Sequence, residues 1–201
     1  IGGSLEGMST KDLGEHTLKD LGRPERIYQI VHPDLADDFP TLQSLDALPN
    51  NLPIQLTSFV GRGVELNEVV KRLHDSRLLT LTGVGGSGKT RLSLQAAAES
   101  AADYPNGVWL IELASIGDAD LVPTAIGDVL GLTKSRGGSG NSELGTDATS
   151  ILDQVTGHLA HRTSLLVLDN CEHLITATAR VVQHLLQHCP DLSVIATSRE
   201  G

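Results

Sequence analysis

Residues 83–90 of the 201-residue chain read GVGGSGKT, and this stretch decides the fold class. It matches the pattern G-x-x-x-x-G-K-[ST] and lies between an aliphatic run at 78–82 and a helical pattern that begins near Lys89. Glycines let the backbone curl so that successive N–H groups point at phosphate oxygens, and the following helix adds its positive dipole end. The sequence therefore predicts a phosphate-binding loop. The alternative is a glycine-rich turn with an incidental lysine.

Two side chains at the end of this loop suit a nucleoside triphosphate. We expect the Lys89 ammonium to reach the β- and γ-phosphates, and the Thr90 hydroxyl to coordinate the Mg²⁺ that accompanies them. ATP or ADP with Mg²⁺ is thus the predicted ligand, and the loop alone does not distinguish ATP from GTP.

Short aliphatic runs alternate with helical patterns through the rest of the chain. Besides 78–82, runs at 108–113, 165–168 and 192–196 have the length of buried strands. Repeated strand-then-helix order predicts an α/β fold, a parallel sheet covered by helices of the P-loop NTPase type. A last strand of that sheet is expected beyond residue 201. The unpaired sheet edge that this leaves predicts self-association.

The run LLVLD at 165–169 ends in an acid. A buried strand of this kind delivers a carboxylate to the carboxyl edge of the sheet, where open α/β folds bind their ligands. Asp169 is therefore predicted to hold Mg²⁺ through water, together with Thr90. The alternative is an aspartate that caps the helix after it.

The run VIATSR at 194–199 ends in an arginine. In the P-loop class with an additional strand between those of the loop and of the acid, the strand at 192–196 lies between these two in the sheet. Its end then projects Arg199 toward the γ-phosphate, whose charge an arginine senses or stabilises. The alternative is a solvated arginine.

The first 55 residues have a different character. Residues 14–31 read as two extended segments around a turn signal, which predicts a hairpin. Residues 32–53 contain four prolines and four acids, a composition typical of an extended linker. We expect a terminal hairpin of an upstream domain at 1–31, a linker at 32–55 and a nucleotide-binding domain at 56–201. Because the chain starts with Ile1, it is expected to be part of a longer protein.

The charge balance disfavours some functions. Lys and Arg number 15 against 25 Asp and Glu, a net charge of −10, so the surface repels phosphate backbones and anionic lipid. Cys171 and Cys189 are expected as reduced thiols, and no apolar run approaches the roughly 18–20 residues of a membrane span. A cytoplasmic protein is predicted, one whose contacts with DNA are made only by domains outside this chain.

Four stretches, in this order, resemble the NB-ARC-like nucleotide-binding domain of the signal-transduction ATPases with numerous domains. They are FVGRGVEL at 59–66, GVGGSGKT at 83–90, LLVLDNCEHL at 165–174 and VIATSRE at 194–200. The chain looks most like bacterial transcription regulators that join a class III nucleotide-cyclase-like domain, this ATPase, a helical repeat region and a LuxR-type helix-turn-helix. Residues 12–35 resemble the final hairpin of such a cyclase-like domain.

The resemblance implies roles for individual residues. In that family the turn that contains Arg62 lies near the base and sugar of the nucleotide, but Gly63 replaces the usual glutamate here. Asn170 stands where many relatives carry a second acid that activates water, and Glu172 is the nearby candidate to replace it. The expected catalytic residues are Lys89, Glu172 and Arg199. The expected nucleotide contacts are Arg62, Gly83, Val84, Gly85, Gly86, Ser87, Gly88, Lys89, Thr90 and Arg91.

The leading hypothesis is an ATP-binding regulatory switch module, with slow ATP hydrolysis, of a multidomain bacterial transcriptional regulator. The alternative is a P-loop kinase of a small acceptor, for which the loop around Arg136 is the one candidate lid. Cyclase activity is excluded for this segment because the metal-binding aspartates of such a catalytic domain cannot be placed. A zinc site around residues 171–189 is disfavoured because the apolar stripe of the helix there leaves His184 and His188 on or near its polar side.

Overall fold

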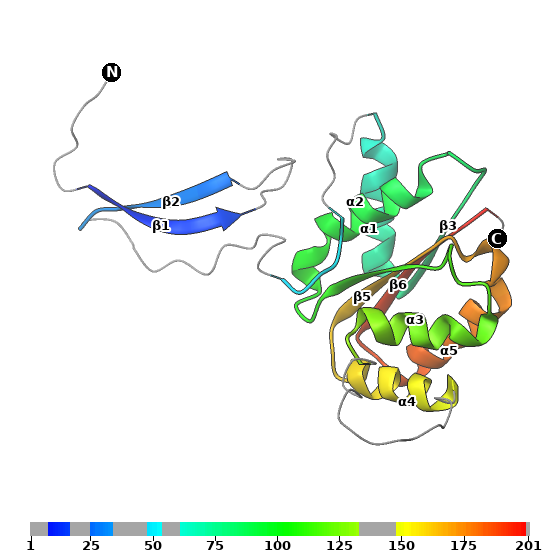
Figure 1. Cartoon of the computed structure of the whole chain (residues 1–201). Helices are drawn as coiled ribbons and strands as arrows, with labels where there is room; N and C mark the ends of the chain where they lie inside the picture. Colours follow the sequence, from blue (N-terminus) through cyan, green and yellow to red (C-terminus); the bar gives the residue numbers. More distant parts are fainter. Residues whose placement is uncertain (1–7, 17–24, 34–47, 54–60, 133–147, 200–201) are drawn as a thin grey trace.

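The computed structural model describes residues 8–16, 25–33, 48–53, 61–132 and 148–199 (Figure 1). The strands are β1 (Ser9–His16), β2 (Glu25–Val31), β3 (Leu78–Thr82), β4 (Val108–Glu112), β5 (Ser164–Asp169) and β6 (Leu192–Ser198). The helices are α1 (Gly63–Asp75), α2 (Lys89–Glu99), α3 (Val122–Val129), α4 (Ala148–Leu159) and α5 (Ile175–His188), with 3-10 turns η2 (Ala101–Asp103), η3 (Ala119–Leu121) and η5 (Cys171–His173). The predicted lid around Arg136 lies outside the described residues.

Strands β3, β4, β5 and β6 form one parallel sheet in the order β3-β6-β5-β4 (Figure 1). The last strand along the chain, β6, is inserted between β3 and β5. Parallel neighbours need crossover connections, and helices carry the chain across the faces of the sheet. The predicted α/β class and the predicted position of β6 are both confirmed.

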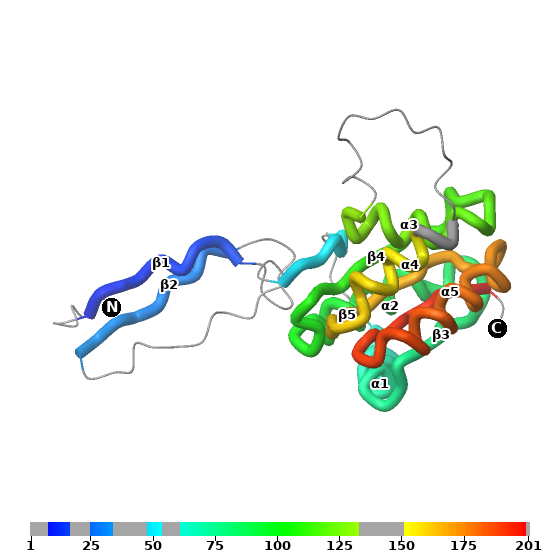
Figure 2. The backbone as a smooth tube through the Cα atoms, turned by 90° about the horizontal axis from the view of Figure 1, so that it is seen from below, coloured from blue at the N-terminus to red at the C-terminus, as the bar shows by residue number. Residues whose placement is uncertain are grey.

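Helices cover both faces of this sheet (Figure 1 and Figure 2). Side chains alternate along a strand, so Leu166 and Leu168 of β5 point to one face, whereas Leu165 and Val167 point to the other. The first pair packs in a core with α3, α4 and α5, and the second pair packs with residues of α1 and α2. None of the helices described here has the length and apolar character that a bilayer span requires.

β1 and β2 form the predicted antiparallel hairpin. An ion pair joins the two strands: the Arg26 Nη2 donates to Asp12 Oδ2 at 2.7 Å. The register shifts between Asp12 and Gly14, where the glycine has a φ of +92°. The hairpin begins at Ser9, earlier than the predicted residue 14, and its turn lies outside the described residues.

Residues 48–53, part of the predicted linker, lie along β4. The Asn51 side chain bonds Leu110 twice: its Nδ2 donates to Leu110 O at 2.8 Å, and its Oδ1 accepts from Leu110 N at 2.6 Å. The Val108 N–H donates to Pro49 O at 3.0 Å. Gly107 permits this approach, because its φ is +119° and a Cβ there would lie 2.9 Å from Pro49 O. The segment therefore belongs structurally to the sheet at its β4 edge.

The opposite edge of the sheet is β3. Within the described part of the chain, β3 pairs on one side only, with β6. Leu78 of β3 is 43% exposed, whereas Leu166 of β5 is fully buried. An edge of this kind offers backbone N–H and C=O groups to another strand. The self-association expected from the sequence stays a prediction.

Candidate functional site

The 83–90 loop joins the carboxyl end of β3 to α2, which begins at Lys89 as the sequence predicted. Gly83, Gly86 and Gly88 have φ angles of +152°, +76° and +81°. Residues with a Cβ rarely adopt these angles, so glycine is required for the loop to turn as it does. These three glycines are therefore required by the backbone conformation of the loop.

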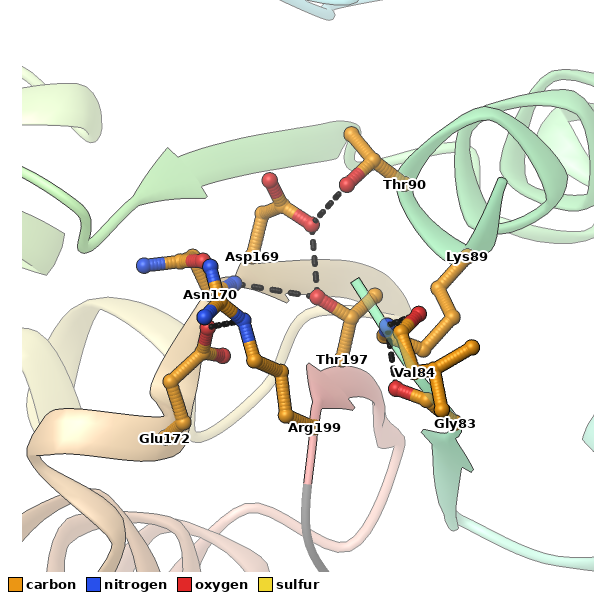
Figure 3. Close-up of polar contacts among 9 residues, drawn as sticks. All are labelled: Gly83, Val84, Lys89, Thr90, Asp169, Asn170, Glu172, Thr197 and Arg199. Atoms are coloured by element: carbon orange, nitrogen blue, oxygen red, sulfur yellow. Dashed lines mark hydrogen bonds and ion pairs between the residues drawn. The ribbon is translucent and has the colours of Figure 1, made fainter. Parts of the chain in front are cut away.

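The Lys89 side chain folds back over this loop (Figure 3). Its Nζ donates hydrogen bonds to Gly83 O at 2.6 Å and to Val84 O at 3.0 Å. The half-buried ammonium is thereby held at the mouth of the loop, close to the N-terminus of α2. A cation in this position favours an anionic ligand.

Thr90, Asp169 and Thr197 form a hydrogen-bonded cluster (Figure 3). The Thr90 Oγ1 donates to Asp169 Oδ1 at 2.7 Å, and the Thr197 Oγ1 donates to the same oxygen at 2.6 Å. The three side chains come from α2, β5 and β6. The parallel sheet thus brings together Thr90 and Asp169, the two residues predicted to hold Mg²⁺.

Thr197 is a site residue that the sequence did not predict. It is 2% exposed, and its Oγ1 also accepts a hydrogen bond of 3.0 Å from the backbone N–H of Asn170. This one hydroxyl therefore fixes both the Asp169 carboxylate and the chain directly after it. The only sequence signal is its place near the end of the strand inserted between β3 and β5, and threonine is common in any strand.

Asn170 turns the chain at the end of β5. It has φ 65° and ψ 52°, and it is the only non-glycine residue with a positive φ in the described part of the chain. Asparagine tolerates the left-handed conformation better than most residues do. The 3-10 turn η5 follows, anchored by the buried Cys171, and carries Glu172 back toward the site. Asn170, which stands where the resembling family often has a second acid, thus shapes the backbone here.

Glu172 and Arg199 form an ion pair, with 2.9 Å between the Arg199 Nε and Glu172 Oε1 (Figure 3). Arg199 directly follows β6, whose register pairs Ser198 with Thr82 of β3. It therefore leaves the sheet beside the start of the 83–90 loop. A Cβ built on Gly85 would lie 3.8 Å from the Arg199 Nε, so the guanidinium lies against the loop.

Arg62 lies against the end of the loop. Its Nη1 donates to Ser87 O at 2.7 Å, and the same nitrogen would lie 3.2 Å from a Cβ on Gly88. Gly63, which replaces the acid expected from the resemblance, begins α1. Glu65 is the acid that Arg62 meets instead, with 3.5 Å between the Arg62 Nε and Glu65 Oε1.

A cavity of about 500 Å³ lies between the loop, the first turns of α2 and the residues that follow β5 and β6. This volume is within the range of small-molecule sites. The predicted residues that line it are Gly85, Gly86, Gly88, Lys89, Thr90, Arg91, Glu172 and Arg199. Leu94, Asn170 and Thr197 complete the lining. Of the other predicted residues, Gly83, Val84 and Asp169 are hydrogen-bonded to the lining.

The cavity is positively charged although the chain is acidic. Its charged lining residues are the cations Lys89, Arg91 and Arg199 and one anion, Glu172. The whole chain, in contrast, has a net charge of −10. Local concentration of positive charge draws an anionic ligand to this cavity. The Asp169 carboxylate is hydrogen-bonded to Thr90, which lines the cavity. A divalent cation bound at this point would balance the charge of the carboxylate.

The ranges that the structure describes hold no group of three or more His, Cys, Asp or Glu side chains able to bind a metal ion. Burial raises the pKa of the Cys171 thiol to about 11. A Mg²⁺ ion bound through one carboxylate, a hydroxyl and ligand phosphates does not require such a cluster.

Comparison with known proteins finds relatives but no matching family model. A protein of Mycobacterium tuberculosis with the name "Uncharacterized protein" is 42% identical over 146 residues, which are 73% of this chain and 34% of that protein. A second protein of that organism, named "Putative HTH-type transcriptional regulator", is 39% identical over 128 residues, or 64% of this chain and 13% of that protein. The chain thus spans about a third or less of the length of these relatives.

Among solved structures, the chain is similar to a signal transduction ATPase with numerous domains from Pyrococcus horikoshii, a protein with a tetratricopeptide repeat sensor. The TM-score is 0.41 and the sequence identity 20%, over 71% of this chain and 21% of that chain. A likeness of this degree does not transfer a function.

Proposed function

We propose that this chain carries an ATP·Mg²⁺-binding regulatory switch module, with slow ATP hydrolysis, of a multidomain bacterial transcriptional regulator. One observation carries the proposal: the glycine loop, Lys89 and the hydrogen-bonded pair of Thr90 and Asp169 converge on one positively charged cavity. This combination of groups is the one that P-loop proteins use to bind a nucleoside triphosphate and its cation.

The residues present fit such a ligand. Gly85, Gly86 and Gly88 line the cavity without a Cβ, so no side chain of theirs separates the backbone from bound phosphate. Lys89 and the N-terminus of α2 would bind the β- and γ-phosphates. Thr90 and Asp169 would hold Mg²⁺, which when bound neutralises part of the phosphate charge. Arg62, next to the end of the loop, would contact the base or sugar.

Slow hydrolysis follows from the groups around Asp169. Attack by water on the γ-phosphate is helped by a carboxylate that accepts a proton, in a site closed against solvent. Asn170 has no carboxylate and serves the backbone turn. Glu172 is engaged by Arg199. We therefore expect turnover far below the typical enzyme value of about 10 s⁻¹.

The regulatory context rests on the resemblance and on the printed name of one relative. In this proposal the chain is an NB-ARC-like module, the hairpin of β1 and β2 ends a cyclase-like domain, and DNA is contacted by other parts of the protein. The net charge of −10 supports DNA contacts by other parts of the protein, because an acidic surface repels the phosphate backbone. The open edge of β3 is the surface through which copies would associate.

Steady-state phosphate release by the 201-residue chain in ATP and Mg²⁺ tests this function. The proposal predicts tight ATP binding with slow release of phosphate. Rapid turnover that disappears in Lys89→Ala would favour an autonomous ATPase, and turnover only with an added small acceptor would favour a kinase. Arg72→Ala, which changes an exposed cation of α1 that does not line the cavity, is the matched control.

A further inference from the structure

The ion pair of Glu172 with Arg199 suggests a role for Glu172 other than that of a base. We infer that Glu172 is a positioning residue that competes with the terminal phosphate of the nucleotide for the Arg199 guanidinium, and thereby sets how strongly the site prefers triphosphate to diphosphate. This inference rests on the proposed function.

The two partners differ in how firmly they are held. The Glu172 side chain is 19% exposed, whereas that of Arg199 is 65% exposed. Glu172 lies on the short turn η5, which is pinned by the bond from Asn170 N to Thr197 Oγ1 and by the bond from Leu174 N to Cys171 O. Glu172 is therefore the fixed partner, and Arg199, beyond the last residue of β6, is the one that can change contacts.

Arg199 is already within reach of the loop. Its guanidinium lies against Gly85, and both Arg199 and Gly85 line the cavity with Lys89. The shortest contact of the ion pair is made by the Nε of the guanidinium. A phosphate bound at the loop offers several oxygens and more negative charge than one carboxylate, and a planar guanidinium binds such a group through two nitrogens.

Competition of this kind has a defined energetic consequence. A γ-phosphate that recruits Arg199 must weaken the contact with Glu172, so the carboxylate subtracts from the affinity for ATP. A diphosphate ends one phosphate earlier and disturbs the ion pair less. Because the pair is partly solvated, the expected effect of losing the carboxylate is about twofold to fivefold in affinity.

The test is a double-mutant cycle on the 201-residue chain. Calorimetric titrations with ATP and with ADP, each with Mg²⁺, are made on the wild type, Glu172→Gln, Arg199→Gln and the double variant. We expect Glu172→Gln to tighten ATP binding about twofold to fivefold, the size of a partly exposed charge contact, and to leave ADP binding nearly unchanged. In the Arg199→Gln background, the same substitution should change neither affinity. A purely structural role would not give an ATP-specific effect that depends on Arg199.

Other outcomes overturn the inference. If the wild type binds ATP and Glu172→Gln leaves the ratio of ATP to ADP affinity unchanged, Glu172 does not compete for Arg199. If Glu172→Gln abolishes hydrolysis with both affinities unchanged, Glu172 is a catalytic base. If Glu172→Gln does not fold, Arg199→Gln still tests the premise: an Arg199→Gln variant with unchanged ATP affinity would overturn the inference, because Arg199 would then not bind the terminal phosphate for which Glu172 is said to compete. A wild type that binds neither nucleotide overturns the proposed function itself, a result distinct from the first two.

Discussion

The side chains of Thr90 and Asp169 are joined by a hydrogen bond of 2.7 Å although the residues are 79 positions apart in the sequence. The bond connects the first turn of α2 to the last residue of β5. Strand β6 lies between β3 and β5, and its Thr197 supports the same carboxylate oxygen. The site is therefore assembled by the parallel sheet order rather than by any one motif.

Thr197→Val tests the support of Asp169. The variant keeps the shape of the side chain but leaves the half-buried Asn170 N–H without its acceptor, which costs about 1 kcal/mol of unfolding free energy. Urea denaturation would measure this loss. Thr80→Val, the same change at an exposed position of β3, should stay within about 0.5 kcal/mol of the wild type. Equal stability of the Thr197 and Thr80 variants would contradict the role given to this hydroxyl.

Asn170→Ala tests the left-handed turn after β5. Alanine has no side-chain group to compensate for the positive φ, so the variant should lose about 1–2 kcal/mol of unfolding free energy. Asn170→Gly removes the same amide without that strain and should be the more stable of the two. Thermal unfolding of both variants is the measurement. An alanine variant as stable as the glycine variant would show that backbone strain does not select asparagine here.

Gly107→Ala tests the packing of residues 48–53 against β4. The added Cβ would lie 2.7 Å from the Trp109 Nε1 and 2.9 Å from Pro49 O, at a φ of +119°. We expect a loss of about 1–3 kcal/mol of unfolding free energy. Gly117→Ala is the control, because a Cβ at Gly117 meets nothing within 4 Å. Similar stabilities of these two variants would contradict the packing of this segment.

The raised pKa of the Cys171 thiol predicts that the free energy of unfolding depends on pH. Burial raises its pKa from 9.0 to about 11. The stability that comes from the protonated thiol is therefore complete below pH 9 and is lost as the pH rises toward 11. Urea denaturation at pH 8, 9, 10 and 11 should show this decline, which is at most about 3 kcal/mol. The decline should shrink more in Cys171→Ala than in Cys189→Ala, because burial raises the pKa of the Cys189 thiol as well. An unchanged decline in the Cys171 variant would refute the assignment.

Much of the site could be predicted from local sequence because its strongest features are local. The glycine pattern requires positive φ angles, and the acid after four aliphatic residues lies at the carboxyl end of a buried strand. Both follow from the chemistry of a few adjacent residues. The position of β6 required more, namely the order of strands in the P-loop class, and it is confirmed.

The remaining features depend on contacts between distant segments. In the sequence, Thr197 cannot be distinguished from any other strand threonine. Its role depends on the fold, which places Asp169 and Asn170, at the end of β5, beside it. The ion pair of Glu172 with Arg199 depends on the left-handed turn at Asn170, which no hydrophobic period encodes. Residues 48–53 are rich in proline and asparagine, a composition that predicts a linker. In the structure, the Asn51 side chain forms two hydrogen bonds with the backbone of Leu110 in β4.

The most direct test of the proposed function is calorimetric titration of the 201-residue chain with ATP in the presence of Mg²⁺. The comparison is between the wild type, Lys89→Ala, and Lys71→Ala, which changes an exposed lysine of α1 outside the nucleotide cavity. We predict one ATP bound per chain in the wild type and in Lys71→Ala, and affinity lower by at least about tenfold in Lys89→Ala because a charge-assisted contact with phosphate is lost. Equal ATP affinity in Lys89→Ala and the wild type, or no binding by the wild type, would contradict the account.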